Sequence, residues 1–360
     1  MSTCIGSGKY TAQIRHISGG IIEEIAASEI LEGSWNRLIS ATSGAHISVP
    51  LGGNLSQTCC KYVDLGKGIP AYELWLWRDV DGADLELVWL GVITDISIQA
   101  GGLVSIDASD HSKWLHYRLL PSSTHVSEDI NSIAYSFVST ALATNNPGNL
   151  SVIWEPAGLT GEKSPDVLDG SHVIDSVTDV IRGVSYWTCN LRQFRIGTTT
   201  QIAWTFTDED LPETPPLSWS LDNFATAMFT RTKNSLSGYS GGINSSTFGA
   251  DILIEKVIDA NVNTVPDANA FAAKRLTQQT SSGPRLEALR SALSPQSGVQ
   301  LDQLWPGATA DVLFDAYCDP VRRTLYLTQI ETSWNADDED IRVELSPNIG
   351  DPNDPRVAKA

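Results

Sequence analysis

The sequence has few basic residues for its number of acidic ones. It contains 24 Lys and Arg against 43 Asp and Glu, which gives a formal net charge of −19 over 360 residues. A chain this acidic repels phosphate backbones and anionic lipid surfaces, so we do not expect it to bind either tightly. It also lacks an apolar run of the roughly 18 residues that a membrane helix needs. Its first residues lack the apolar segment of a signal peptide. We therefore expect synthesis and folding in a cytoplasm.

Cysteine is scarce and scattered. The chain has five, an odd number, and none forms a C-x-x-C pair, which argues against zinc-ribbon and thioredoxin-like sites. Free cysteines are among the most frequently buried residues, so we expect buried thiols at Cys4, Cys59, Cys60, Cys189 and Cys318.

Catalytic and metal-binding motifs are also sparse. There is no G-x-S-x-G elbow, and residues 6–9 (GSGK) lack the spacing of a phosphate-binding loop. His111 and His116 lie near Asp107 and Asp110, but five residues do not place two histidines on one helix face as i, i+4 does. A Ser-His-Asp arrangement has no fixed order and stays open at this level. We predict no catalytic, cofactor-binding or metal site.

Two further groups allow a binding interpretation. Residues 337–340 are acidic, yet they lack the glycine and terminal glutamate of an EF-hand loop, so a solvated turn is favoured over a Ca²⁺ site. Trp75, Trp77 and Trp89 fall on neighbouring predicted strands and offer a sugar-binding platform, although a barrel core or subunit interface is favoured.

The first third of the chain has the alternation of β-strands. Residues 9–25 predict a hairpin that turns at Gly19 and Gly20, and residues 46–49 and 72–78 predict further strands. Residues 88–98 and 103–108 predict a second hairpin, followed by an aromatic segment that begins as a helix. This short, regular spacing indicates a barrel or sandwich.

The sequence pattern changes to helical periodicity after residue 120. Apolar residues from Ile130 to Ala141 recur on one face, behind a cap at residues 127–129 that places acids in the first turn. A strand is predicted at 152–154, and a second helix from Ser171 ends at Gly183. Residues 185–196 and 201–207 predict a hairpin.

The last third returns to β structure. An acidic, proline-rich connector at 208–217 leads to strands at 229–233 and 251–257. A third helix begins at Pro266. A final hairpin pairs 324–331 with 340–345 across an acidic tip that is expected to discourage edge pairing. Its pattern repeats that of the hairpin near residue 100, which suggests two related units.

These patterns predict a β-rich α+β protein with two related β-barrel domains and a helix-containing middle region. The expected divisions are 1–120 for the first barrel, 121–215 for the middle region, and 216–360 for the second barrel with one helix.

The order of several segments resembles a known family. The segments are SWNRLISATSGAHISV, AYELWLWRD, LVWLGVITDI, HVIDSVTDVIRGVSYWTC, ANAFAAKRL and LSPQSGVQLDQLWPGA. Together they resemble the minor tail proteins of siphophages that infect actinobacteria, in the group that is similar to the tail-tip, or baseplate, hub. The resemblance covers most of the chain and rests on fold patterns rather than catalytic signatures.

The resemblance implies a structural role in the virion. Proteins of this kind form a ring-shaped homotrimer at the tail tip, with two similar barrels in each subunit. The implied partners are the distal tail protein, the tape-measure protein and a central tail fibre or spike, and genomic DNA passes through the lumen without specific binding. No enzymatic activity and no cofactor are expected. The alternatives are a distal tail ring protein, a saccharide-binding tail adhesin, or a cell-wall hydrolase with a carboxylate pair.

Overall fold

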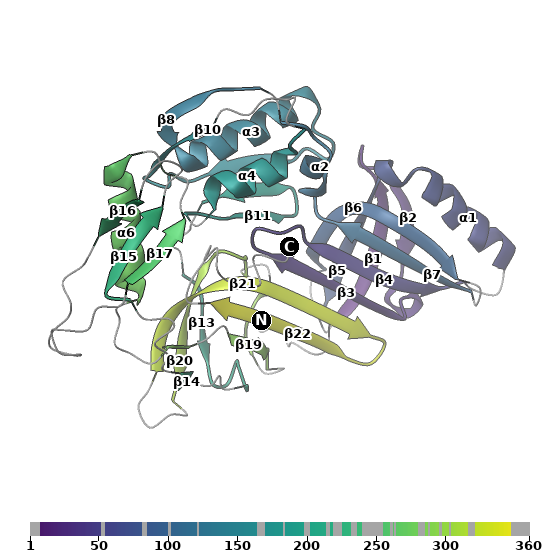
Figure 1. The fold of residues 1–360 in the computed structure, drawn as a ribbon. Coiled ribbons are helices and arrows are strands. Elements are labelled where there is room, and N and C mark those ends of the chain that lie inside the picture. The colour runs from purple at the N-terminus through teal and green to yellow at the C-terminus, as the bar shows by residue number, and fades with distance from the viewer. Residues whose placement is uncertain are drawn as a thin grey trace.

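The structure is a computed structural model in which strands predominate and a few helices pack around them (Figure 1). It describes residues 8–51, 55–80, 85–99, 102–120, 122–163, 170–182, 184–197, 202–213, 217–218, 225–231, 236–239, 255–259, 262, 264–279, 285–286, 289–294, 297–301, 304–315 and 321–346.

Most of the strands belong to one 12-stranded sheet, and its first seven come from the N-terminal part of the chain. Their order across the sheet is β2-β1-β5-β6-β7-β4-β3. Alternate residues point into a common core, as Tyr10, Ala12 and Ile14 do in β1. The two hairpins and the strands predicted here are confirmed at β1 (Lys9–His16), β2 (Ile21–Ile25), β4 (Gly44–Pro50), β5 (Tyr72–Asp79), β6 (Glu86–Gln99) and β7 (Leu103–Ser109). The seventh strand, β3 (Glu32–Leu38), was not predicted.

The C-terminal strands continue the same sheet. The predicted last hairpin is confirmed as β21 and β22, but its acidic tip does not keep β21 at an edge. β21 pairs antiparallel with β3, from Gln329 opposite Leu38 to Asn335 opposite Glu32. The strands of this half are β13 (Ile202–Thr207), β19 (Leu289–Ala292), β20 (Thr309–Phe314), β21 (Val321–Asn335) and β22 (Glu339–Ser346).

The hairpin predicted between residues 185–196 and 201–207 is wrong. The hairpin lies entirely within the first segment, as β11 (Trp187–Asn190) and β12 (Gln193–Ile196). β13 instead leaves this region and pairs in parallel with β20. The physical reason is burial, because Phe206 of β13 is fully enclosed by the core of the large sheet.

A second layer of helices and short strands packs beside the sheet, above it in Figure 1. The predicted helical face is confirmed in α3 (Ile130–Thr144), where Ile133, Phe137 and Val138 are buried. Asp129 caps this helix, but residues 127 and 128 belong to a strand rather than to its first turn. The other elements are α2 (Lys113–His116), β8 (His125–Asp129), β9 (Ser151–Trp154), β10 (Thr160–Lys163) and α4 (Val173–Ile181).

Elements from the second half of the chain complete this layer. The helix predicted at Pro266 is confirmed as α6, and its Phe271, Ala272 and Leu276 join the core formed by α3 and α4. These elements are β15 (Ala227–Arg231), β16 (Leu236–Tyr239), β17 (Glu255–Asp259) and α6 (Val265–Gln279). β14 (Leu217–Ser218) and β18 (Arg285–Leu286) form a separate two-stranded sheet.

The sequence pattern did not predict one helix, α1 (Leu55–Lys67), which contains Cys59 and Cys60. It packs against β6 and is followed by a short 3-10 turn at Ile69–Ala71; another such turn occupies Ala27–Glu29. Among the described residues, no helix is long and apolar enough to cross a bilayer.

The described residues form two hydrophobic cores, and neither is continuous in sequence. The first core takes residues from 10–108 and again from 206–345. The second takes residues from 115–196 and again from 225–276. Residues 216–360, the expected second barrel, contribute to both cores. The division at residues 120 and 215 stays a prediction.

Candidate functional site

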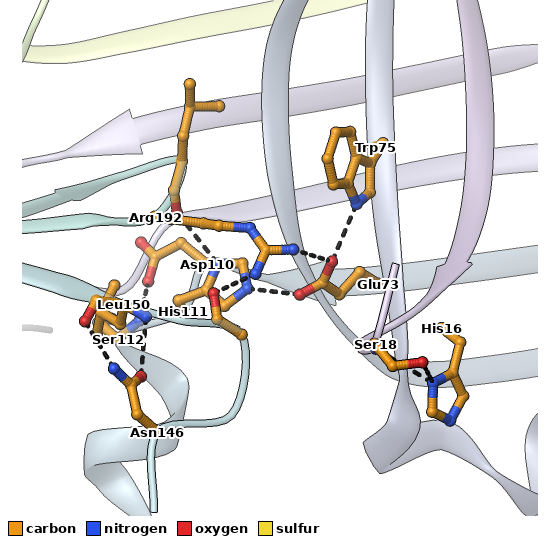
Figure 2. Close-up of polar contacts among 12 residues, drawn as sticks. His16, Ser18, Glu73, Trp75, Asp110, His111, Ser112, Asn146, Leu150 and Arg192 are labelled. Carbon is orange, nitrogen blue, oxygen red and sulfur yellow. Dashed lines mark hydrogen bonds and ion pairs between the residues drawn. The ribbon is translucent and has the colours of Figure 1, made fainter. Parts of the chain in front are cut away.

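A buried polar cluster lies where the two cores meet (Figure 2). Its centre is Glu73, which β5 places with none of its surface exposed. One carboxylate oxygen accepts from Arg192 Nη2 at 2.7 Å and from Trp75 Nε1 at 3.0 Å. The other oxygen lies 3.0 Å from His111 Nε2. Glu73 thus joins the large sheet to groups that belong to the second layer.

His111 follows β7 and is also fully buried. Its second ring nitrogen, Nδ1, lies 3.1 Å from the carbonyl oxygen of Leu191 in the β11–β12 turn. Gly148 packs so closely that a Cβ there would lie 2.7 Å from the imidazole. Arg192 also donates to the Gly148 carbonyl. The imidazole is therefore enclosed by three separate segments of the chain.

The residues next to His111 extend this cluster. Both oxygens of Asp110 accept backbone N–H groups, from Ser43 at 2.7 Å and from Ser112 at 2.8 Å. Burial raises the pKa of Asp110, and these hydrogen bonds act in the opposite direction. Burial also raises the pKa of the Cys189 thiol well above its usual value, so this cysteine is the inert buried type.

A second buried cluster links the N-terminal strands to the C-terminal hairpin. Arg78 Nε and Nη2 donate to the two oxygens of Glu339 at 2.7 and 2.8 Å, and both side chains are almost fully buried. Tyr10 donates to the same carboxylate at 2.5 Å and stacks on Trp334 with centroids 3.9 Å apart. Burial and the Glu339 charge raise the pKa of Tyr10 well above its usual value.

The histidines and aspartates weighed as a metal cluster have separate partners. His116 Nε2 lies 2.8 Å from Thr42 Oγ1, whereas Asp107 pairs with His46 at 2.8 Å. Within the described ranges, no three His, Cys, Asp or Glu side chains are grouped closely enough to hold a metal ion. The polar partners of His111 and His116 make them part of the packing between elements.

The three tryptophans do not share a face. Trp75 and Trp77 stack on the side of β5 away from the first core, with centroids 6.1 Å apart, and both are half-buried. Trp89 is buried in the first core and donates to the Asn36 carbonyl at 3.2 Å. Arg15 lies 4.2 Å above the Trp75 ring. The three-tryptophan platform is therefore wrong, since register places Trp89 opposite Leu76.

The remaining candidate groups also have structural partners. The acidic turn at residues 337–340 is only partly solvated, because its last members begin β22 and Glu339 is buried against Arg78. Of the segment 6–9, the N–H of Gly8 donates to Glu339 at 3.1 Å and Lys9 begins β1. Cys4 and Cys318 lie outside the described residues.

A shallow groove lies between the segment that follows α1 and the residues of α2. It has a volume of about 590 Å³ and is lined by Ile17, Pro70, Trp114, Tyr117 and Arg118, among others. Tyr117 is 66% exposed at this groove.

Few sequence patterns predict the two buried clusters. One signal was available in YELWLWRD, where alternation places Arg78 on the same face as Leu74 and Leu76. A charged residue on an apolar strand face implies a buried partner. The partner Glu339 lies 261 residues away, so no local pattern identifies it.

The fold that carries these clusters is similar to that of solved phage tail proteins. No protein-family model and no curated protein matches the sequence. Solved structures do match, at identities that establish similarity of fold alone. The β-rich, baseplate-hub-like fold class predicted from the sequence is confirmed.

Three of these structures illustrate the match. A tail protein from Neisseria meningitidis MC58 has a TM-score of 0.59 at 14% identity, over 93% of this chain and 96% of that one. Prophage tail protein gp18 from Listeria monocytogenes EGD-e has a TM-score of 0.54 at 12% identity, over 98% and 100%. The E. coli c3393 protein has a TM-score of 0.50 at 10% identity, over 89% and 74%. It is a type VI secretion component described as structurally similar to T4 tail proteins gp27 and gp5.

Proposed function

We propose that this protein is the tail-tip hub of a bacteriophage, a structural virion protein of the kind found in siphophages of actinobacteria. The observation that carries the proposal is the length of the match. Tail proteins from two bacteria align over 96% and 100% of their own chains, so the similarity covers the complete architecture rather than one shared barrel. The similarity to c3393, itself described as similar to the T4 tail proteins gp27 and gp5, adds a further match to tail-like proteins.

The described polar clusters support a structural role. Glu73, Arg78 and Glu339 have the burial and charge that a catalytic group often has. Each is nevertheless held by partners within the chain that join distant segments. Such groups fix the geometry of a scaffold. We expect no enzymatic activity, and a cell-wall clearing assay with the purified chain checks this.

In the proposed assembly, three copies form a ring at the tail tip. The ring would connect the tail tube and the distal tail protein to a central fibre or spike, beside the tape-measure protein. Genomic DNA would cross the lumen during ejection. Part of the −19 net charge, if it faces the lumen, would repel phosphates and reduce sticking. A basic or neutral lumen in a structure of the assembled ring would refute this role for the charge.

The native mass of the purified chain at micromolar concentration tests the proposal. A trimer, three times 38.9 kDa, is the expected result. A hexamer would favour a distal tail ring instead. A monomer that binds saccharide would favour an adhesin and turn attention to the stacked Trp75–Trp77 pair, the part of the tryptophan group that remains accessible. Glycan binding with Trp77→Ala as the negative variant separates these outcomes, because Trp75 also donates to the buried Glu73.

A further inference from the structure

We propose that the groove beside α2 is a docking site for a second copy of this chain, and that its occupant is the acidic tip of the β21–β22 hairpin, residues 335–338. The contact rests on the proposed function in one respect, because a ring of subunits requires self-association. It goes further by assigning the two surfaces that meet, the groove of one subunit and the hairpin tip of the next.

The groove exposes the residue types that dominate protein–protein interfaces. Leu115 of α2 is fully buried in the second core, whereas Trp114 and Tyr117, three residues apart, share another side of this turn and line the groove. Arg118 lines it as well, and Leu119 beyond it is 52% exposed. Tryptophan, tyrosine and arginine are the types most enriched at interface hot spots. Small ligands prefer enclosed cavities, so this shallow surface suits a protein partner.

The groove is also positively charged, in a protein of net charge −19. Lys113 Nζ lies 5.6 Å from the centroid of the Tyr117 ring, and Arg118 Nη2 donates to the neutral Asn145 carbonyl at 3.0 Å. Within the described part of the chain, no carboxylate forms an ion pair with either cation. Complementary charge selects partners at interfaces, so the surface that fits here is acidic.

The hairpin tip is acidic and firmly held. Asp337 and Asp338 are exposed, and the Asn335 side-chain oxygen accepts from their backbone N–H groups at 2.8 and 3.0 Å. The Asn335 N–H donates to the Asp338 carbonyl at 3.0 Å. The next residue, Glu339, is buried against Arg78 and anchors the base of the turn. A turn fixed in this way loses little conformational entropy when it binds.

The two surfaces lie at opposite ends of β1. Gly8, before this strand, donates to Glu339 beside the hairpin tip at 3.1 Å, and Ile17, after it, lines the groove. At about 3.3 Å per residue, these nine steps separate the two surfaces by roughly 30 Å. The tip of one copy therefore does not fill its own groove. A contact between two different surfaces is head-to-tail, and it closes into a ring when its rotation allows.

In the docked pair, Trp114 and Tyr117 pack against the backbone of the tip, and the two cations of the groove face Asp337 and Asp338. Exposed ion pairs add little affinity, so the aromatic contact supplies most of it and the charges select the partner. Tyr117→Ala is therefore expected to weaken self-association by about tenfold or more, measured by sedimentation over a concentration series.

An exchange of charges tests the pairing. One variant carries Lys113→Glu with Arg118→Glu, and a second carries Asp337→Lys with Asp338→Lys. Each is expected to lose the assembly at micromolar concentration, because like charges then face each other, and a chain with all four substitutions is expected to regain it. Arg182→Glu, at a cation 60% exposed after α4, is the control and is expected to assemble normally. An unchanged mass in either paired variant would overturn the proposal, as would a loss that the exchange does not restore.

Photo-crosslinking locates the contact directly. A photoreactive phenylalanine analogue replaces Tyr117, and these chains are mixed with isotope-labelled wild-type chains. After trypsin digestion, the expected cross-link joins residue 117 to the labelled peptide 324–342, which contains the tip. The same analogue at Val126, which is 61% exposed, is the control and is expected not to label this peptide. A trimer whose cross-links from residue 117 map elsewhere would overturn this contact and leave the hub proposal standing. A monomer without cross-links would overturn both.

Discussion

At the scale of single residues, this protein places charge in its interior and pairs it across long distances in sequence. Arg37 is one example, since its buried guanidinium donates to the carbonyls of Val88, Leu301 and Leu304. A buried charge without its partner costs several kcal/mol, whereas an exposed pair contributes little. The buried groups therefore specify which segments meet.

The substitution Glu339→Gln tests whether removing the partner of a buried charge destabilises the protein at the Arg78 cluster. It removes the charge that compensates a guanidinium only 2% exposed, so we expect a loss of about 3–5 kcal/mol in the free energy of unfolding. Denaturant unfolding followed by tryptophan fluorescence measures it. The control is Glu331→Gln in the same hairpin, which breaks an exposed pair with Arg290 and is expected to cost about 1 kcal/mol or less. Equal losses would contradict the argument.

Tyr10 makes the stability that this cluster contributes depend on pH in the alkaline range. Burial, followed by the Glu339 charge, raises the pKa of this tyrosine well above 10.0. The folded state therefore holds the phenolic proton after the unfolded state has released it, and stability falls as pH rises above about 10. We expect Tyr10→Phe, which retains the ring stacked on Trp334, to show a shallower decline in melting temperature between pH 9 and pH 11. Parallel curves would refute the assignment.

At the scale of elements, the pairing of β3 with β21 decides how the two halves of the chain join. Gly33 and Trp334 are partners in this pair, and the indole covers the glycine. A Cβ on Gly33 would lie 2.2 Å from the Trp334 ring. The absence of a side chain at residue 33 is what lets the tryptophan reach Tyr10.

Gly33→Ala is therefore expected to destabilise the protein by roughly 1–3 kcal/mol, through displacement of a packed indole. Thermal unfolding measures the loss, and near-ultraviolet circular dichroism reports on the Tyr10–Trp334 stack. Gly44→Ala in the next strand is the control, because the nearest atom to its added Cβ lies 3.7 Å away, at ordinary contact distance. A similar effect in both variants would point to strand propensity instead.

At the scale of the whole molecule, the first core is closed by both ends of the described chain. Tyr10 and Ile14 share it with Leu325, Ile330 and Val343. A chain with this arrangement is expected to fold its sheet only after most of its length is present, since the contacts that close the core are distant in sequence.

A fragment of residues 1–120, the first expected domain, tests that arrangement. In this fragment β3 lacks its partner β21 along one edge, and Arg78 is buried without Glu339. We therefore expect aggregation or a loss of cooperative unfolding. Co-expression with residues 121–360 is expected to restore a soluble complex. A fragment that unfolds cooperatively on its own would show that the first barrel is an independent domain.

The sequence by itself determined the local structure. Alternation identified β1, β5, β6 and the last hairpin, and the 3.6-residue period identified α3, because side-chain spacing is set by the backbone of each element. Pro266 identified the start of α6. It also fixed the acidic charge and the β-rich fold class.

Only the tertiary structure decided which elements are neighbours. Nothing local indicated that β13 leaves the β11–β12 hairpin for β20, or that the acidic tip of β21–β22 buries Glu339 against Arg78. Likewise, the sequence placed Trp89 with Trp75, and strand register separated them. The buried cluster around Glu73 forms only where three segments of the chain come together. Its geometry follows from the free energy of enclosing charges with their partners, which depends on the whole chain rather than on any one stretch.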